Sequence, residues 1–104
     1  MIISTTETVP GREIAETLGI VRGNTIRARH VGRDIVAGLR NLVGGEIAEY
    51  TKLMAESREQ AIDRMIESAD ALGADAVVCV RMATSMVMAQ AAEILAYGTA
   101  VRLR

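Results

Sequence analysis

The sequence predicts an α+β fold, in which strands at both ends of the chain form one sheet and a helical block lies between them. Apolar residues near the two ends recur with period two, which is typical of strands. Those in the middle recur at three- and four-residue steps, which is typical of helices. The chain has 104 residues, the size of one domain. We therefore expect a single domain over residues 1–104, with the element order β-β-α-α-β-β and an antiparallel or mixed sheet.

Two strands are predicted before the helical block. Residues 2–3 fit a short strand, which ends at the turn-forming sequence VPGRE. A longer strand is predicted from Ile14 to about Arg29. Gly19 and Gly23 are expected to mark β-bulges or close approaches of the backbone. The strand's large apolar residues share one parity, which predicts a common face: Ile14, Leu18, Ile20 and Ile26.

The middle of the chain has helical periodicity in two segments. The first runs from Ile35 to Val43 and ends at a pair of glycines. The second runs from about Glu46 to Leu72, and Gly73 is placed to cap its C-terminus. We expect both helices to pack on one face of the sheet.

Two more strands follow the helices, from Asp75 to about Met88 and from Ala92 to Arg104, and neither has a polar face. Regular alternation should place Cys79 and Val78 on opposite faces of the first of them. The helices can cover one face of the sheet, whereas leaving the other in water costs about 25 cal/mol per Å² of apolar surface. A second copy of the chain is the simplest cover, so we expect a homo-oligomer.

Charge and composition exclude several classes of function. Twelve basic and thirteen acidic residues give a net charge of −1, which provides no basic surface for nucleic acid. The apolar runs are too short for a membrane-spanning helix, which needs about 20 residues. A single cysteine and the lack of a secretory signal pattern favour the cytoplasm. We expect a cytoplasmic protein that binds neither nucleic acid nor a membrane.

Three motifs carry a resemblance to a known family. GRDIVAGLRNLVGGE, LGADAVV and GTAV, in this order and at these separations, resemble the YbjQ-like family of small bacterial and archaeal proteins, which is labelled heavy-metal-binding. The resemblance covers nearly the whole chain. It implies an α+β subunit that assembles into a ring, typically a pentamer, and it supplies no agreed set of ligand residues. His30 stands where an Asn is usual in the family, and Cys79 where many members have Gly.

Cys79 and His30 are the candidate metal ligands. A thiolate binds soft metal ions strongly, and His30 is the sole imidazole. Free cysteine is also a common small buried residue, and the spacing of Cys79 and His30 matches no zinc motif. The sequence does not identify a cofactor, and a soft metal ion is the candidate that these two residues suggest. A ring could bring the same side chain of several subunits together around its axis.

Two further groups of charged residues have both a structural and a binding interpretation. Arg33, Asp34 and Arg40 lie in the most specific part of the family motif and suit either a subunit interface or an anion site. Five carboxylates follow each other at helical steps along the second predicted helix, which favours a solvated face over a cation site. These are Glu56, Glu59, Asp63, Glu67 and Asp70.

The function favoured by the sequence is binding rather than catalysis. The chain contains neither a GxxxxGK[ST] loop nor a GxSxG elbow, so it is not expected to be an enzyme. We expect a ring-forming homo-oligomer that binds a soft metal ion or a small ligand at the contacts between subunits. A scaffold without a bound ion and an enzyme with an intersubunit site are the alternatives.

Overall fold

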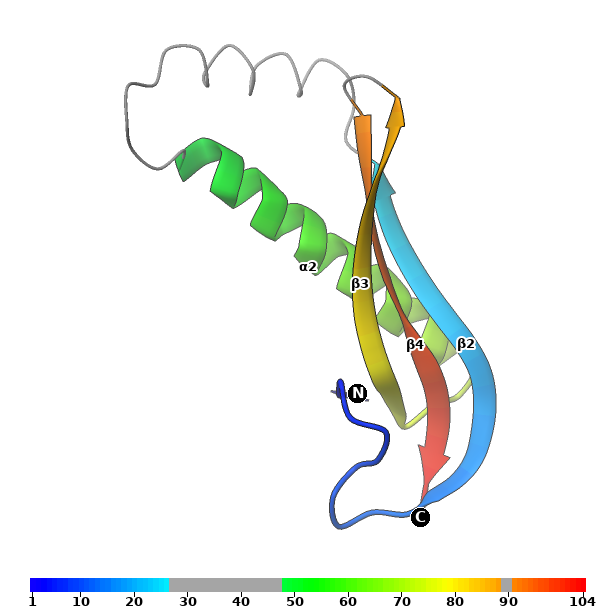
Figure 1. Ribbon diagram of the computed structural model, residues 1–104. Coiled ribbons are helices and arrows are strands. Elements are labelled where there is room, and N and C mark those ends of the chain that lie inside the picture. Colours follow the sequence, from blue (N-terminus) through cyan, green and yellow to red (C-terminus); the bar gives the residue numbers. More distant parts are fainter. Residues whose placement is uncertain (27–47, 89–90) are drawn as a thin grey trace.

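The computed structural model describes residues 1–26, 48–88 and 91–104. The first predicted helix, residues 35–43, lies outside this part of the chain. Within it, one helix packs on one face of a four-stranded sheet, so the predicted α+β class is confirmed (Figure 1). The described elements are β1 (Ile2–Ile3), β2 (Ile14–Ile26), α2 (Ala48–Ala71), β3 (Ala76–Met88) and β4 (Ala91–Leu103).

The sheet has the strand order β1-β3-β4-β2 and is mixed. The short strand β1 runs parallel to β3, whereas β4 is antiparallel to both of its neighbours. The predicted mixed sheet is therefore confirmed. Helix α2 lies on one side of it and crosses the strands diagonally (Figure 1).

Helix α2 contacts the sheet through a stripe of small and medium apolar residues. Ala61, Met65 and Ala69 recur every four residues, so they lie on one side of the helix, and all three are fully buried. They form one cluster with apolar residues of the three long strands, among them Val77 and Ile94. This cluster is the main core of the described residues.

The backbone of the helix lies very close to the sheet at Gly23 of β2. A Cβ atom built on Gly23 would collide with the backbone of Ala61 and of Met65. No side chain larger than hydrogen fits between the helix and this strand, so the close approach expected at Gly23 is confirmed.

The outer edge of β2 is capped by polar side chains of α2. The guanidinium of Arg64 donates to the carbonyl of Asn24 at 2.6 Å. The hydroxyl of Ser68 lies 3.4 Å from the carbonyl oxygen of Arg22 and 3.2 Å from that of Arg64, so its single hydrogen is shared between the two. Within the described sheet β2 pairs only with β4, so the carbonyls of Arg22 and Asn24 point away from the ladder. The helix thus supplies hydrogen bonds that a further strand would otherwise make.

Gly73 ends the helix as predicted. Its φ angle is 76°, in the left-handed region that glycine adopts without a steric penalty. Its N–H donates to the carbonyl of Asp70 at 3.0 Å, and the N–H of Ala74 donates to the carbonyl of Ala69 at 3.1 Å. The next strand begins two residues later, at Ala76.

The common face predicted for the large apolar residues of β2 is wrong. Leu18 packs against the core under α2, whereas Ile14 packs against the cluster on the other face, where Ile20 and Ile26 are 77% and 58% exposed. The register with β4 shifts twice, once just after Ile14 and again just before Gly19, whose φ angle is 130°. Each bulge inserts one residue and exchanges the faces of the side chains that follow. Leu18 therefore points to the helix side, and the second bulge returns Ile20 and Ile26 to the face of Ile14.

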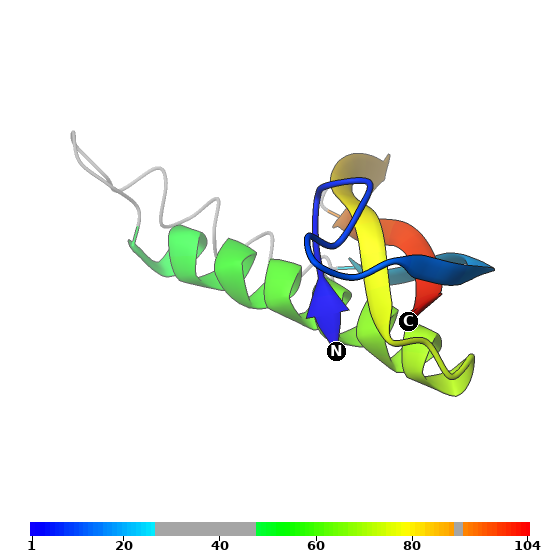
Figure 2. The same cartoon turned by 90° about the horizontal axis from the view of Figure 1, so that it is seen from below.

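The sheet face away from α2 is divided into two regions. Near β1, the chain's own residues 4–13 cover it, with Val9 packed against a cluster that contains Val78 and Val101 (Figure 2). In this region the chain covers its own sheet, so the expectation that the whole face needs a second copy as its cover is wrong here. Further along the strands, large apolar side chains on this face remain exposed: Ile20, Ile26 and Tyr97.

Candidate functional site

Cys79 is the predicted site residue that the structure describes. The other candidate metal ligand, His30, lies outside the described residues, and so do Arg33, Asp34 and Arg40 of the proposed interface or anion site. The geometry of the candidate site is therefore built around Cys79.

Cys79 lies in a β-bulge of β3. The register with β4 shifts between Val78 and Arg81, and the φ angle of Cys79 is 56°. This left-handed conformation is uncommon for residues with a Cβ atom and natural for glycine. The position thus suits the glycine that the family resemblance gives there, and cysteine adopts it at a conformational cost.

The bulge also changes the face on which Cys79 lies. The predicted opposition of Cys79 and Val78 is wrong, because both belong to the cluster on the face away from α2. Val80, which regular alternation would place on the face of Val78, packs instead against the core under α2. The extra residue of the bulge breaks the regular alternation between positions 78 and 80.

The N-terminal segment is hydrogen bonded to this bulge. The N–H of Cys79 donates to the carbonyl of Thr6 at 3.0 Å, and the N–H of Val80 donates to the carbonyl of Ser4 at 2.9 Å. Two successive N–H groups thus point toward the same neighbouring segment, which a regular strand does not permit. The bulge therefore fixes the segment that covers one end of the sheet.

The thiol of Cys79 is free and half-buried. Within the part of the chain that the structure describes, no three His, Cys, Asp or Glu side chains are grouped closely enough to hold a metal ion. The described residues of one chain therefore bring a single soft donor to this place. A thiolate site for a soft ion would need donors from other residues or from other copies of the chain.

Substitutions of Cys79 are expected to report on its backbone conformation. Cys79→Gly should change the free energy of unfolding by less than about 1 kcal/mol, because relief of the left-handed conformation offsets the loss of side-chain packing. Cys79→Val should lower it by about 1–2 kcal/mol, because a β-branched side chain adds strain. Denaturant unfolding followed by circular dichroism measures both, with Cys79→Ala as the control that removes only the thiol. Equal stability of the Val and Gly variants would contradict this account.

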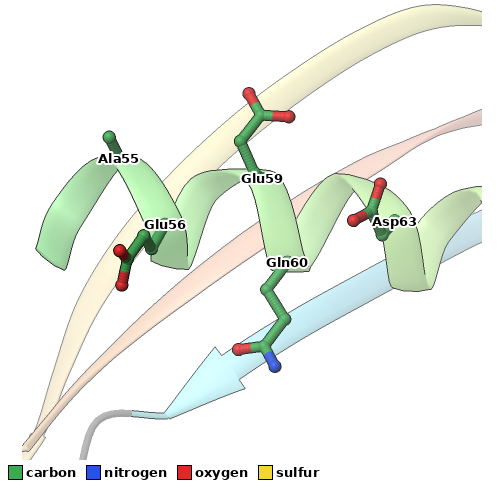
Figure 3. A pocket seen from close by; sticks show the side chains of 5 residues that line it. All are labelled: Ala55, Glu56, Glu59, Gln60 and Asp63. Atoms are coloured by element: carbon green, nitrogen blue, oxygen red, sulfur yellow. The ribbon is translucent and has the colours of Figure 1, made fainter. Parts of the chain in front are cut away.

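The row of carboxylates on α2 is exposed, as predicted. Three of them, Glu56, Glu59 and Asp63, line a shallow pocket together with Ala55 and Gln60 (Figure 3). All five residues come from the same helix, and the carboxylates of Glu56 and Glu59 point apart (Figure 3). The carboxylates therefore do not converge on a common point. We call the whole row the acidic ridge: Glu56, Glu59, Asp63, Glu67 and Asp70.

The sequence did not single out a second row of side chains, which crosses the sheet. Tyr97 of β4 pairs with Arg22 of β2 on one side and with Arg81 of β3 on the other. All three side chains are exposed, and they lie on the face away from α2, because neighbouring residues of each strand point toward the helix. We call these three residues the arginine row. Strand register creates the row, and the bulge at Cys79 sets that register.

Comparison with known proteins places these features in a family. A family model, YbjQ_1, described as "Putative heavy-metal-binding", matches residues 1–104. The chain belongs to this family. The resemblance seen in the motifs of the sequence is thereby confirmed, and the heavy-metal description belongs to the YbjQ_1 family as a whole.

Relatives of this YbjQ_1 chain occur in archaea and bacteria. It is 66% identical over 104 residues to a UPF0145 protein of Archaeoglobus fulgidus, an alignment that covers 100% of this chain and 96% of the relative. A UPF0145 protein of Halorubrum lacusprofundi is 64% identical, with 100% of both chains covered. One from Vibrio campbellii is 58% identical over 99% of each. The names of these relatives state no activity.

A solved structure supports the fold. The crystal structure of a DUF74-family protein of unknown function from Pediococcus pentosaceus matches with a TM-score of 0.67 at 16% sequence identity, covering 100% of this chain and 98% of that one. At this identity the similarity shows the fold alone. In the described part of the YbjQ_1 chain, no helix is both long and apolar enough to cross a membrane.

Proposed function

We propose that the protein is a non-enzymatic homo-oligomer, a pentameric ring by the family resemblance, that binds a soft metal ion or a small ligand at the contacts between subunits. The observation that carries the proposal is the apolar surface on the sheet face away from α2. Ile20, Ile26 and Tyr97 are 77%, 58% and 38% exposed there. Exposed apolar groups that share a face are typical of a protein interface.

The shape of the chain supports self-assembly. Its radius of gyration is 16.9 Å, with principal extents of 54 × 25 × 16 Å. A compact domain of this length has a radius of gyration of about 13 Å. The three long strands form an elongated, curved sheet (Figure 1), so the chain offers much surface for its mass. Contact with other copies would reduce that surface.

The metal part of the proposal is supported by the family description and by the position of Cys79. One chain offers a half-buried thiol, and a ring repeats that thiol once per subunit. The sequence alone contributes two further parts of the proposal. His30 is a second metal ligand, and an interface or anion site is formed by Arg33, Asp34 and Arg40. Repetition by symmetry is the way in which single donors of this kind could complete a site.

Native mass spectrometry tests the assembly. We expect the untagged protein at micromolar concentration to give a mass that is a multiple of 11.1 kDa. Ile20→Lys should raise the concentration needed for assembly roughly tenfold or more, because a charge replaces an apolar contact. Leu72→Lys, at a 46% exposed position beyond the end of α2, is the matched control. A monomeric wild-type protein would refute the proposal.

Elemental analysis of the same preparation tests the bound ion. Protein purified from metal-supplemented cells should carry a soft metal ion in a fixed ratio to the assembly, and Cys79→Ser or His30→Ala should reduce that ratio. If no ion is present in a fixed ratio and neither substitution changes the metal content, the metal part is wrong. The alternative of a scaffold without a bound ion would then replace it.

A further inference from the structure

We propose that neighbouring copies of the chain meet through two different surfaces, with the arginine row of one copy placed against the acidic ridge of the next. The inference rests on the proposed function, because it names the surfaces of the same assembly. Its occupant is a second copy of this chain, and charge complementarity is the main argument.

Both surfaces carry charge that the described part of the chain does not neutralise. The ion pairs found there join Arg102 to Glu16 and Arg104 to Glu13, and they involve neither surface. Arg81 donates to the carbonyl oxygen of Thr5 at 2.9 Å, which positions its guanidinium and leaves its charge uncompensated. Opposite charges on two surfaces of one molecule favour contact between copies over contact between identical surfaces.

The two surfaces face in opposite directions. The acidic ridge lies on the side of α2 away from Ala61, Met65 and Ala69, which pack on the sheet. The arginine row lies on the other face of the same sheet. A contact between row and ridge is therefore head-to-tail, and each copy keeps one free surface for a further copy. Such contacts generate rings when the rotation between copies closes.

The spacings of the charges match. Arg22 and Arg81 lie on strands separated by β4, so two inter-strand steps put their backbones about 10 Å apart. Asp63 and Asp70 are seven residues apart on one side of a helix, which corresponds to about 10.5 Å. Each arginine can therefore face one carboxylate, with Tyr97 between them. Ile20 and Ile26 lie on the same sheet face and add apolar contact beside the charges.

Charge reversal on one surface at a time tests the inference. The sheet variant carries Arg22→Glu and Arg81→Glu, and the helix variant carries Asp63→Lys and Asp70→Lys. Each alone places like charges at every contact, so the concentration needed for assembly should rise roughly tenfold or more. An equimolar mixture should form mixed species that contain both chains, because every contact between unlike variants is then attractive. Native mass spectrometry distinguishes the two chains by mass.

Two controls keep the test sharp. Arg58→Glu with Arg104→Glu makes the same change in net charge as the sheet variant, at exposed positions outside both surfaces, and should assemble like the wild type. Arg22→Glu alone avoids any disturbance of the segment that Arg81 holds, and it should weaken assembly in the same direction. If both charge-reversed proteins assemble like the wild type, or if the mixture stays unassembled, the surface assignment is wrong while the oligomer stands. A monomeric wild type would overturn the oligomer and this inference together.

Discussion

Replacing Gly23 by alanine is expected to lower the free energy of unfolding by about 3 kcal/mol. The added Cβ would collide with the backbone of Ala61 and of Met65, and lie 2.8 Å from the carbonyl carbon of Arg64. Backbone atoms cannot rotate out of the way as a side chain can. Helix α2 must therefore move away from β2, and the packing of its buried stripe is lost along with the contact itself.

Denaturant unfolding at one fixed protein concentration measures this effect, because assembly makes apparent stability depend on concentration. Thr17→Ala is the control, since Thr17 is an exposed residue of the same strand. It should change the free energy of unfolding by about 0.5 kcal/mol or less. If Gly23→Ala proved as mild as Thr17→Ala, the close approach of α2 to β2 would be refuted.

Met65→Ala is expected to cost about 3 kcal/mol, within the range found for emptying a buried methionine site. Met65 is among the largest fully buried side chains in the described residues, and it lies at the centre of the stripe that α2 presents to the sheet. Alanine would leave a cavity there. The backbone contact at Gly23 prevents the helix from moving closer to fill it.

The matched control is Leu72→Ala, one residue beyond α2, where the side chain is 46% exposed. Its loss should cost about 1 kcal/mol or less, because half of the side chain is already in contact with water. Met65→Leu should recover most of the stability, since it nearly conserves the volume. A Met65→Ala protein as stable as the wild type would contradict the position of the core.

The elements of the fold could be predicted because their signals are local. Period-two and helical patterns need only neighbouring residues, and the observed strands and helix begin and end within three residues of the predicted limits. The Gly73 cap and the bulge at Gly19 follow from the conformations that glycine allows. These features are encoded within a few residues of where they occur.

The faces of the strands could not be predicted in the same way. Each bulge exchanges the two faces for the rest of its strand, so Leu18 packs under α2 while Ile20 and Ile26, predicted on the same face as Leu18, lie exposed on the other side. The bulge at Cys79 carries no glycine, and the cysteine gave no signal of its left-handed backbone. Its hydrogen-bond partners are residues 4–6, more than 70 positions earlier in the chain, so the bulge belongs to a long-range contact.

The candidate site shows the same difference between features encoded locally and features that depend on distant residues. Cys79 was predicted first as a small packed residue, and the structure places it half-buried beside Val78. The arginine row depends on which residues lie opposite each other on three strands. Period-two patterns indicate faces but not register, so Arg22, Tyr97 and Arg81 gave no common signal in the sequence.

The capping of β2 by α2 has a consequence for the solubility of the protein. A long, bare strand at the margin of a sheet is a template on which other molecules can stack into fibrous aggregates. Arg64 occupies the carbonyl of Asn24, and Ser68 lies within hydrogen-bond distance of the carbonyl of Arg22, at an edge where such growth would otherwise start. Detachment of the helix would therefore expose the unpaired edge of β2 as well as the apolar core. The helix that completes the interior is therefore also expected to hinder aggregation through this edge.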